Sequence, residues 1–437
     1  MKQKTDVIIV GSGAAGLFHA LHLSRDKSIT IVTKDDAEKS DSYLAQGGIC
    51  VLKSEDDYDS YYEDTMRAGH YENRKESVEV MIRSSAEIIQ ELIDFGVEFE
   101  KDGDTLLYTR EGGHSDSRIL FHADVTGKEI TSKLLERARE RENITICEHH
   151  TMVDLLVRDN TCYGVLVQTP GGELVPLYAD YTVLACGGLG GLYEHSTNFR
   201  HITGDALAIA LQHNIKLEHI DYIQIHPTTL YSTEPGRRFL ISESVRGEGA
   251  VLLDRNKERF VNELLPRDLL TAKVREQMKK DNMPYVWLSM EPIPRDTIIN
   301  HFPNIYKRCL EEGYDCTREP IPVVPAQHYF MGGIWVDIDS HTSMEHLYAI
   351  GETSCNGVHG RNRLASNSLL ESLVFARRAA AHMEHNYHLL NTGKLSPETA
   401  PEFFALEGTW REDGDERKKR YRQLVFDEIE KERMKHL

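Results

Sequence analysis

The chain has 437 residues, and its 40% hydrophobic and 28% charged residues form an ordinary globular composition that excludes wholesale disorder. At roughly 150 residues per domain, this length predicts about three domains. The 51 basic and 70 acidic residues give a net charge of −19, which disfavours nucleic acid and anionic membranes as partners.

Apolar runs and cysteines narrow the class further. No run approaches the roughly 18 apolar residues that cross a bilayer, and the N-terminus lacks the pattern of a signal peptide. The seven cysteines are scattered and form no CxxC pair, so neither a disulfide framework nor a metal site is predicted. We therefore expect a cytoplasmic protein without a bound metal.

The chain opens with a pattern typical of a βαβ unit. Residues 6–10 (DVIIV) predict a buried strand, residues 17–25 a helix, and residues 28–34 a second strand. The motif GSGAAG at 11–16 lies between the first strand and the helix. A GxGxxG motif in this position indicates dinucleotide binding, whereas the same motif alone is weak evidence.

Each glycine of the motif has a physical role. Gly11 makes the tight turn, Gly13 lets the backbone approach a pyrophosphate at the helix N-terminus, and Gly16 lets helix and strand pack closely. The second strand ends in Thr33-Lys34, without the acid that usually holds a ribose. This weakens an assignment to NAD, but the motif alone leaves both NAD and FAD open.

Further motifs follow in order along residues 6 to about 380. They are GSGAAG (11–16), AQGG (45–48), TREGGHS (109–115), GGLGGLY (187–193), GDALAIA (204–210), HPT (226–228), SESVRGEGA (242–250), PRD (266–268), HYFMGGI (328–334), LYAIGE (347–352) and NRLASNSLLE (362–371). In these motifs the chain resembles the succinate dehydrogenase/fumarate reductase flavoprotein superfamily. The resemblance implies an α/β fold, in which a capping domain of α+β type interrupts a Rossmann-like FAD-binding domain.

The resemblance implies FAD as the cofactor. The positions it implies are Gly11, Ser12, Gly13, Ala14, Ala15 and Gly16 at the pyrophosphate, Lys34 near the adenosine, Asp41, Ser42, Tyr43, Leu44, Ala45, Gln46, Gly47 and Gly48 along the flavin, and Asp205, Glu352, Ser368 and Leu369. Ser368 and Leu369 open a predicted helix, whose N-terminus favours negative charge on a reduced flavin.

One position bears on how FAD is held. Succinate dehydrogenases attach FAD covalently through a histidine five residues before the glutamine of AQGG. Here that position is Asp41. We therefore expect noncovalent FAD, which argues against an enzyme of the respiratory type.

A dicarboxylate oxidase needs two anion clamps, preferably arginines, and a way to handle a proton. The resemblance assigns one carboxylate to Arg363 and His328, the other to His226 with Ser242 and Glu243, and proton transfer to Arg267. Arginine is essentially never deprotonated near neutral pH, so an electrostatic clamp on the substrate is the alternative role for Arg267. Gln224 is a weaker candidate for a pocket contact.

Glu111, in TREGGHS, separates the branches of the superfamily. Succinate and fumarate carry no cation, whereas L-aspartate carries an ammonium that a carboxylate can recognise. The branch that oxidises L-aspartate has this glutamate, and succinate dehydrogenases have an uncharged residue there. The simpler alternative is that Glu111 pairs with Arg110 or Arg118.

The resemblance also implies the domain order. The FAD-binding domain takes residues 1–219 and 330–386, and the capping domain takes residues 220–329 between them. The substrate is expected at their junction, where rotation of the cap can open and close the site. Residues 387–437 form a linker and a truncated C-terminal helical segment.

The C-terminal end departs from the pattern of the family. Residues 391–415 predict a linker rich in Gly, Pro and acids, and residues 416–436 predict one charged helix. Its apolar face comprises Tyr421, Leu424, Val425 and Ile429. Full-length members of the branch carry a three-helix domain here, and this chain ends at about the first of those helices.

Together the motifs predict FAD-dependent oxidation of L-aspartate to iminoaspartate, with oxygen (giving hydrogen peroxide) or fumarate (giving succinate) as acceptor. The resemblance implies the first step of de novo NAD biosynthesis, functionally coupled to a quinolinate synthase. One alternative is a soluble fumarate reductase-like flavoprotein, against which Glu111 argues. The other is a non-catalytic flavin-binding subunit, against which the intact Arg267, Arg363, His226 and His328 argue.

Overall fold

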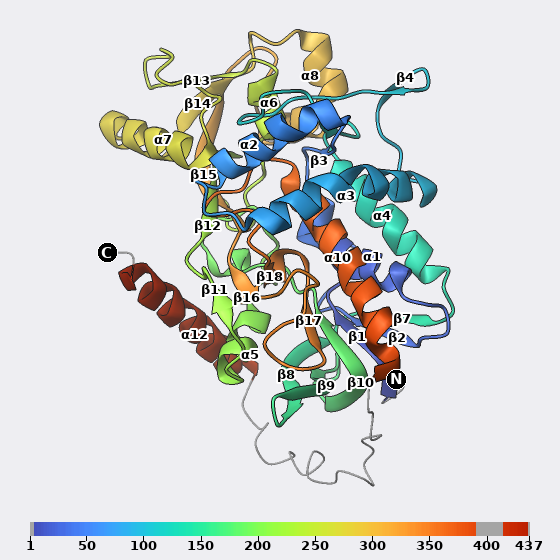
Figure 1. The fold of residues 1–437 in the computed structure, drawn as a ribbon. Coiled ribbons are helices and arrows are strands. Elements are labelled where there is room, and N and C mark those ends of the chain that lie inside the picture. Colours follow the sequence, from blue (N-terminus) through green and yellow to red (C-terminus); the bar gives the residue numbers. More distant parts are fainter. Residues whose placement is uncertain (1–3, 390–413, 436–437) are drawn as a thin grey trace.

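Two sheets organise the fold, a mainly parallel one in the lower half of Figure 1 and an antiparallel one in the upper half. The computed structural model describes residues 4–389 and 414–435. No helix among these described residues is both long and apolar enough to cross a membrane.

The larger sheet has the strand order β7-β2-β1-β10-β9-β8, and β17 also pairs with β10. Pairing is parallel from β7 to β10 and to β17, and antiparallel along β10-β9-β8. The strands are β1 (Lys4–Val10), β2 (Ile29–Val32), β7 (Ile144–Cys147), β8 (Thr151–Arg158), β9 (Thr161–Gln168), β10 (Leu174–Leu184) and β17 (Leu347–Ala349). This topology confirms the predicted α/β class and the βαβ opening.

Both faces of this sheet are covered, which is why β1 is a continuous apolar run. Val7 and Ile9 of β1 pack into one core, and Ile8 and Val10 into the core on the opposite face. The first core includes α1 (Ala14–His22), α3 (Lys75–Asp94), α4 (Thr126–Arg139) and α10 (Asn367–Asn386), and α2 (Tyr58–Ala68) packs on α3. The second includes α5 (Asp205–Gln212) and α12 (Gly414–Lys435).

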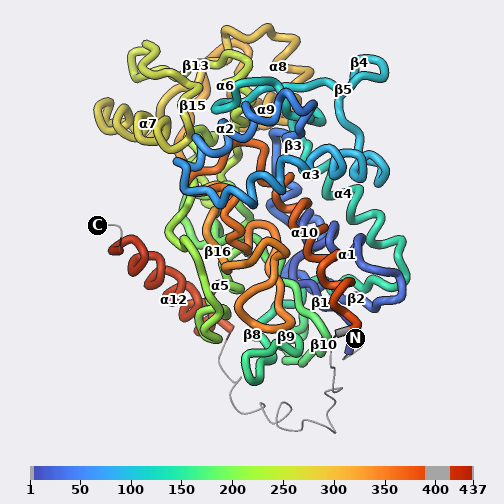
Figure 2. Tube along the Cα trace, in the orientation of Figure 1, coloured from blue at the N-terminus to red at the C-terminus, as the bar shows by residue number. Residues whose placement is uncertain are grey.

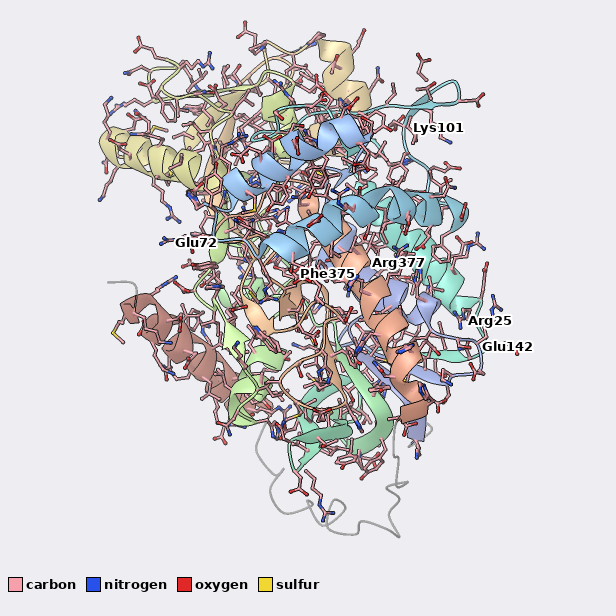
Figure 3. All side chains as sticks on the ribbon, viewed as in Figure 1. Arg25, Glu72, Lys101, Glu142, Phe375 and Arg377 are labelled. Atoms are coloured by element: carbon pink, nitrogen blue, oxygen red, sulfur yellow. The ribbon has the colours of Figure 1, made fainter. Side chains whose placement is uncertain are left out.

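Helix α10 shows how one helix serves both core and surface (Figure 3). Phe375 is fully buried in the first core. Two positions on, Arg377 leaves the core and ion-pairs with Glu91 of α3 at 2.8 Å. The helix is thereby fixed from both sides, which positions the residues at its N-terminus.

The second sheet is antiparallel, in the order β12-β15-β14-β13. Its strands are β12 (Ile223–Leu230), β13 (Val251–Leu253), β14 (Val286–Ser289) and β15 (Ile321–Phe330), and its helices are α6 (Glu243–Gly247), α7 (Arg267–Asp281), α8 (Arg295–His301) and α9 (Pro303–Glu311). They enclose a separate core that contains Val245, Leu270 and Ile305. This unit lies above the larger sheet in Figure 1.

Short strands connect the remaining segments. The chain passes between the two units next to a three-stranded sheet of β11 (Leu217–Glu218), β16 (Gly333–Trp335) and β18 (Ser354–Cys355). Two further pairs are β3 (Ile49–Cys50) with β6 (Ile119–Leu120), and β4 (Lys101–Asp102) with β5 (Thr105–Leu106).

The C-terminal helix α12 runs beside α5 (Figure 2). Tyr421, Val425 and Ile429 are buried, as the apolar face predicted, whereas Leu424 is only half-buried. The Tyr421 hydroxyl donates a 2.6 Å hydrogen bond to the carbonyl of Val153 on β8. The predicted linker lies almost entirely outside the described residues.

Candidate active site

A cavity lies between the two units and is lined by residues of both. Because small-molecule sites often lie at such junctions, it is the candidate site for a cofactor and a substrate. Most residues predicted to bind the cofactor line it, namely Gly11, Ser12, Gly13, Ala15, Lys34, Asp41, Ser42, Leu44, Ala45, Gln46, Gly47, Gly48, Asp205, Glu352, Ser368 and Leu369. All the predicted catalytic residues line it too, namely Glu111, His226, Ser242, Glu243, Arg267, His328 and Arg363.

Three predicted cofactor residues do not line the cavity: Ala14, Gly16 and Tyr43. Ala14 is buried at the start of α1. A Cβ on Gly16 would lie 2.3 Å from the carbonyl oxygen of Gly11, so this glycine permits the close approach of helix and turn. Tyr43 is half-buried beneath the ammonium of Lys128.

The glycine turn at the start of α1 has the geometry that a pyrophosphate needs. Gly11 has φ of +119°, and a Cβ there would lie 2.0 Å from the carbonyl oxygen of Ala185. Gly13 is the N-cap of α1 and has no side chain of its own to cap the helix, while the amide of Ala14 donates a 3.2 Å hydrogen bond to the hydroxyl of Ser42. The other amides of the first turn can face an anion in the cavity.

At the predicted adenosine end, Lys34 is already paired. Its Nζ lies 2.5 Å from Oδ2 of Asp205 and donates a 2.7 Å hydrogen bond to the carbonyl of His201. No acid ends β2, and the carboxylate near this end of the cavity comes instead from Asp205, the first residue of α5.

Several side chains in the cavity wall are suited to a polar ligand. Each has a buried nitrogen or oxygen without a hydrogen-bond partner among the described residues: Ser40 Oγ, Asp41 Oδ2, Gln46 Oε1, Asn198 Oδ1, His226 Nε2 and Arg363 Nε. Burial raises the pKa of Asp41 to about 7, against the backbone N–H of Phe199 and the charge of Arg237, which lower it. Burial, followed by the charge of Asp41, raises the pKa of Glu352 to about 8. Because buried polar atoms are normally paired, these residues fit a cofactor rich in donors and acceptors, such as FAD.

Arg267 begins α7 and is held by two side chains. Its Nε donates a 2.6 Å hydrogen bond to Oε2 of Glu243, and its Nη1 donates a 2.8 Å bond to Oε1 of Gln224. Burial acts to raise the pKa of Glu243, but the charges of Arg267 and Arg246 outweigh it, and the net pKa is lowered. The pair is therefore an ionised one, with part of the Arg267 fork left for a ligand.

Two neutral histidines face each other, with ring centroids 5.2 Å apart. Burial, followed by the nearby charge of Arg267, lowers the pKa of both His226 and His328 well below the usual value. Nδ1 of His226 lies 3.0 Å from the carbonyl oxygen of Thr228 and 3.2 Å from its amide nitrogen, so it donates to the first or accepts from the second according to the tautomer. Nδ1 of His328 hydrogen-bonds the hydroxyl of Thr197 at 2.7 Å. In the tautomer that carries its proton on Nε2, each ring can offer Nε2–H to a carboxylate.

Arg363 provides a second cation, and it comes from a loop before α10. Burial lowers its pKa to about 10, so it stays protonated at neutral pH. Nη1 donates a 3.1 Å hydrogen bond to the hydroxyl of Ser368, and the guanidinium lies 4.6 Å from the ring centroid of Tyr329. These contacts fix the orientation of the guanidinium and leave Nε unpaired among the described residues.

Glu111 is buried and pairs with neither Arg110 nor Arg118. Its two carboxylate oxygens accept hydrogen bonds from the hydroxyls of Ser244, at 2.7 Å, and Ser366, at 2.6 Å. It lies against the predicted flavin loop, since a Cβ on Gly47 would be 2.7 Å from Oε1. Among the described residues its carboxylate oxygens hydrogen-bond these two hydroxyls, and the buried guanidinium of Arg246 lies close enough to interact with its charge.

The sequence did not reveal some residues that complete the site. Thr197 orients His328, and Ser244 and Ser366 orient Glu111, each from a distant part of the chain. Arg237, whose charge acts on Asp41, also lines the cavity. Ser244 and Ser366 lie inside the motifs SESVRGEGA and NRLASNSLLE, but neither motif indicated an orienting role; Ser366 is the N-cap of α10 and has φ of +62°.

This arrangement suits a small dicarboxylate that also carries an amine. Arg267 and Arg363 supply two cations, and the histidines supply neutral donors. Glu111 supplies an anion in the same cavity. Succinate or fumarate would satisfy the two arginines but would bring no cation to the Glu111 carboxylate.

Comparisons with known proteins agree with this chemistry. A family model described as an FAD binding domain matches residues 6–369. An L-aspartate oxidase of Clostridium perfringens is 49% identical over 430 residues, which are 98% of this chain and 95% of that protein. One of Pseudomonas aeruginosa is 40% identical over 433 residues, which are 94% of this chain and 79% of that protein. Among solved structures, E. coli quinol fumarate reductase FrdA is similar in fold, with a TM-score of 0.85 and 28% identity. The match covers 92% of this chain and 73% of the FrdA chain.

Proposed function

The chain belongs to the L-aspartate oxidase family, within the flavoproteins related to succinate dehydrogenase and fumarate reductase, and from this we propose that it oxidises L-aspartate to iminoaspartate. FAD is the cofactor of the family. With Asp41 at the position where relatives of the respiratory type have a linking histidine, the cofactor is noncovalent. The protein acts in the cytoplasm.

The observation that carries this proposal is Glu111 in the same cavity as Arg267 and Arg363. Arg363 and His328 bind one substrate carboxylate, and His226, Ser242 and Arg267 bind the other. Glu111, held by two hydroxyls, binds the ammonium. Three charges matched in this way fix the substrate Cα relative to the cofactor.

FAD, when bound, accepts two electrons and a proton from the substrate. To form the C=N bond, the substrate nitrogen must first lose a proton, which passes to solvent, so that its lone pair is available. Arg267 stays protonated beside Glu243 and stabilises the substrate carboxylate by its charge. The proposed role of Arg267 is therefore an electrostatic clamp that orients the substrate, and not a base.

Reoxidation needs an acceptor. Fumarate has the same two carboxylates as the substrate and fits the same clamps, which would yield succinate; oxygen would yield hydrogen peroxide. The similarity in fold to a quinol fumarate reductase supports the first acceptor. Iminoaspartate hydrolyses in water, so we propose prompt consumption by a quinolinate synthase in NAD biosynthesis.

The test is an assay of both products with each acceptor. Purified protein with L-aspartate should form hydrogen peroxide in air, or succinate from fumarate without air. Oxaloacetate and ammonia, from hydrolysis of the imine, should appear in equal amounts. Reduction of fumarate by an artificial donor, with no turnover of L-aspartate, would instead identify a fumarate reductase.

A further inference from the structure

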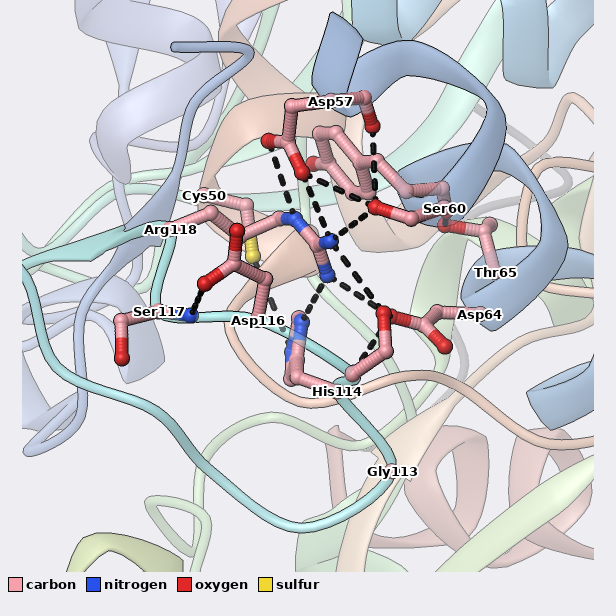
Figure 4. A network of polar contacts seen from close by, with 12 residues as sticks. Cys50, Asp57, Ser60, Asp64, Thr65, Gly113, His114, Asp116, Ser117 and Arg118 are labelled. Atoms are coloured by element: carbon pink, nitrogen blue, oxygen red, sulfur yellow. Dashed lines mark hydrogen bonds and ion pairs between the residues drawn. The ribbon is translucent and has the colours of Figure 1, made fainter.

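The segment that follows Glu111 in the sequence belongs to a buried polar cluster, shown in Figure 4, that has no role in the reaction proposed above. At its centre is Arg118, whose side chain is fully buried. Nη2 of Arg118 donates to Oδ1 of Asp57 at 2.9 Å, and Nη1 donates to Oδ2 of Asp64 at 2.8 Å. Both acids are buried too, at the start and in the middle of the α2 region.

The cluster holds the segment that carries Glu111. Asp64 also accepts hydrogen bonds from the backbone N–H and the hydroxyl of Ser115, at 2.6 and 2.7 Å. Arg67 of α2 donates to the carbonyl of Gly113 at 3.2 Å. A buried charge of this kind needs several partners, and these partners come from two separate parts of the chain.

His114 extends the cluster toward the site. Nη1 of Arg118 donates to Nδ1 of His114 at 3.2 Å, which requires a lone pair on Nδ1 and puts the ring proton on Nε2. Nε2–H then donates to the carbonyl of Ala365 at 3.0 Å. Burial lowers the pKa of His114, which keeps the ring neutral in this tautomer.

Two glycines link Glu111 to His114 along the backbone. They are Gly112 and Gly113, and Gly113 has φ of +85°. The amide of His114 donates to the carbonyl of Glu111 at 3.3 Å. On the other side of the link, Ala365 precedes Ser366, whose hydroxyl binds Glu111. The imidazole of His114 thus connects the segment that carries Glu111 with the segment that carries Ser366, whose hydroxyl orients the Glu111 carboxylate.

We propose that His114, held in one tautomer by Arg118, is a positioning residue that sets Glu111 for recognition of the substrate amine. This inference rests on the proposed oxidation of L-aspartate and adds a specificity-determining role for the two residues. It makes discrimination between L-aspartate and a dicarboxylate without an amine depend on a side chain that does not touch the substrate.

The segment that carries Arg363 is held by hydrogen bonds that do not involve His114. Binding of the substrate carboxylates can therefore be separated from binding of its amine. Nε2 of Gln224 donates to the carbonyl of Arg363 and to Oδ1 of Asn362, both at 2.8 Å. Nδ2 of Asn362 in turn donates to the carbonyl of Ala68 at 3.0 Å. Loss of the His114 link should therefore disturb Glu111 and Ser366 while the Arg363 guanidinium stays in place.

The experiment compares two ligands on His114→Asn, which can still accept from Arg118 but is too short to reach Ala365. Anaerobic stopped-flow reduction gives the apparent Kd for L-aspartate, and perturbation of the flavin absorbance gives the Kd for succinate. We expect the first to rise about ten-fold or more and the second to stay within about two-fold. His114→Gln, which can replace the Nε2–H donor, should restore most of the affinity for L-aspartate.

Two further variants make the outcome decisive. In a Glu111→Gln background, His114→Asn should change the affinity for L-aspartate by less than about two-fold, because it acts through Glu111. Arg118→Lys, which cannot keep both acids and His114, should show the same selective loss as His114→Asn. The matched control is His19→Asn, another buried histidine bound to a carbonyl of α10, which should affect neither ligand.

Equal losses for L-aspartate and succinate, or an undiminished effect in the Glu111→Gln background, would show that His114 only supports packing and would overturn the inference. Unchanged affinities in both His114→Asn and Arg118→Lys would also overturn it. A wild-type protein that L-aspartate does not reduce would contradict the proposed function instead, and the two failures are thereby distinguished.

Discussion

Nε of Arg267 lies 2.6 Å from Oε2 of Glu243, and both side chains are buried in the wall of the cavity. Removal of either partner would leave an unpaired buried charge. The ion pair fixes the guanidinium of Arg267 at the first residue of α7, where it faces the substrate end of the cavity. The charge of this arginine is therefore both permanent and oriented.

Arg267→Lys should lower kcat for L-aspartate by about 10²–10³-fold, because lysine cannot bond Glu243 and Gln224 while it binds the substrate. Flavin content and its visible spectrum should stay unchanged. Arg275→Lys, on the exposed side of the same helix, is the control and should retain full activity. Full activity in Arg267→Lys would mean that any cation at this position is sufficient.

Glu111→Gln should raise the Kd for L-aspartate by about 10–100-fold, because the amide keeps the shape of the side chain and loses its charge. The inhibition constant of succinate, which carries no ammonium, should stay within about two-fold. Steady-state kinetics with succinate as competitor measure both constants. If the affinities for L-aspartate and for succinate fall equally, Glu111 does not recognise the amine.

Gly11→Ala should yield protein without bound flavin. The φ of +119° strains any other residue by about 1–3 kcal/mol, and the new Cβ would lie 2.0 Å from the carbonyl oxygen of Ala185. The ratio of visible flavin absorbance to ultraviolet protein absorbance reports the bound flavin. Gly171→Ala, whose nearest neighbour atom is 3.8 Å from the added Cβ, should keep its flavin. A yellow Gly11→Ala protein would contradict the assignment of the turn.

The buried carboxyl of Glu371 predicts a pH-dependent stability. Burial raises its pKa from the usual 4.5 to about 7, so the folded protein retains this proton to a higher pH than the unfolded chain. The contribution of Glu371 to the free energy of unfolding is complete below pH 4.5, and it is lost as the pH rises to about 7. Up to about 3 kcal/mol is lost over this interval.

Glu371→Gln should remove this loss, since the amide remains neutral. Urea unfolding at about pH 5 and pH 8 measures it, and the variant should be the more stable protein only at the higher pH. Glu142→Gln, at an exposed position, should follow the wild type. Parallel pH profiles for Glu371→Gln and wild type would show that Glu371 does not titrate in this range.

The motif residues were predictable because local sequence determines their geometry. Gly11 and Gly16 are needed by a turn and a close contact within a few residues of one another. The resemblance implies the contiguous run from Asp41 to Gly48 along the flavin, and Tyr43 is the member of this run that does not line the cavity. The run contains the 3₁₀ turn Asp41–Leu44, and with three residues per turn not every side chain can face the cavity.

The orienting contacts were not predictable, because they join residues far apart in the chain. Ser244 and Glu111 are 133 residues apart, and Thr197 and His328 are 131 apart. Serine and threonine are common and carry no local signal for such a role. Only the packing of the two sheets brings these hydroxyls to the charged groups.

The most direct measurement is anaerobic addition of L-aspartate to the purified yellow protein, followed by visible absorbance. Electron transfer from the amino acid predicts that the oxidised flavin bands bleach, while an equal concentration of succinate leaves them in place. Flavin that stays bound and oxidised in the presence of excess L-aspartate would contradict the proposed reaction.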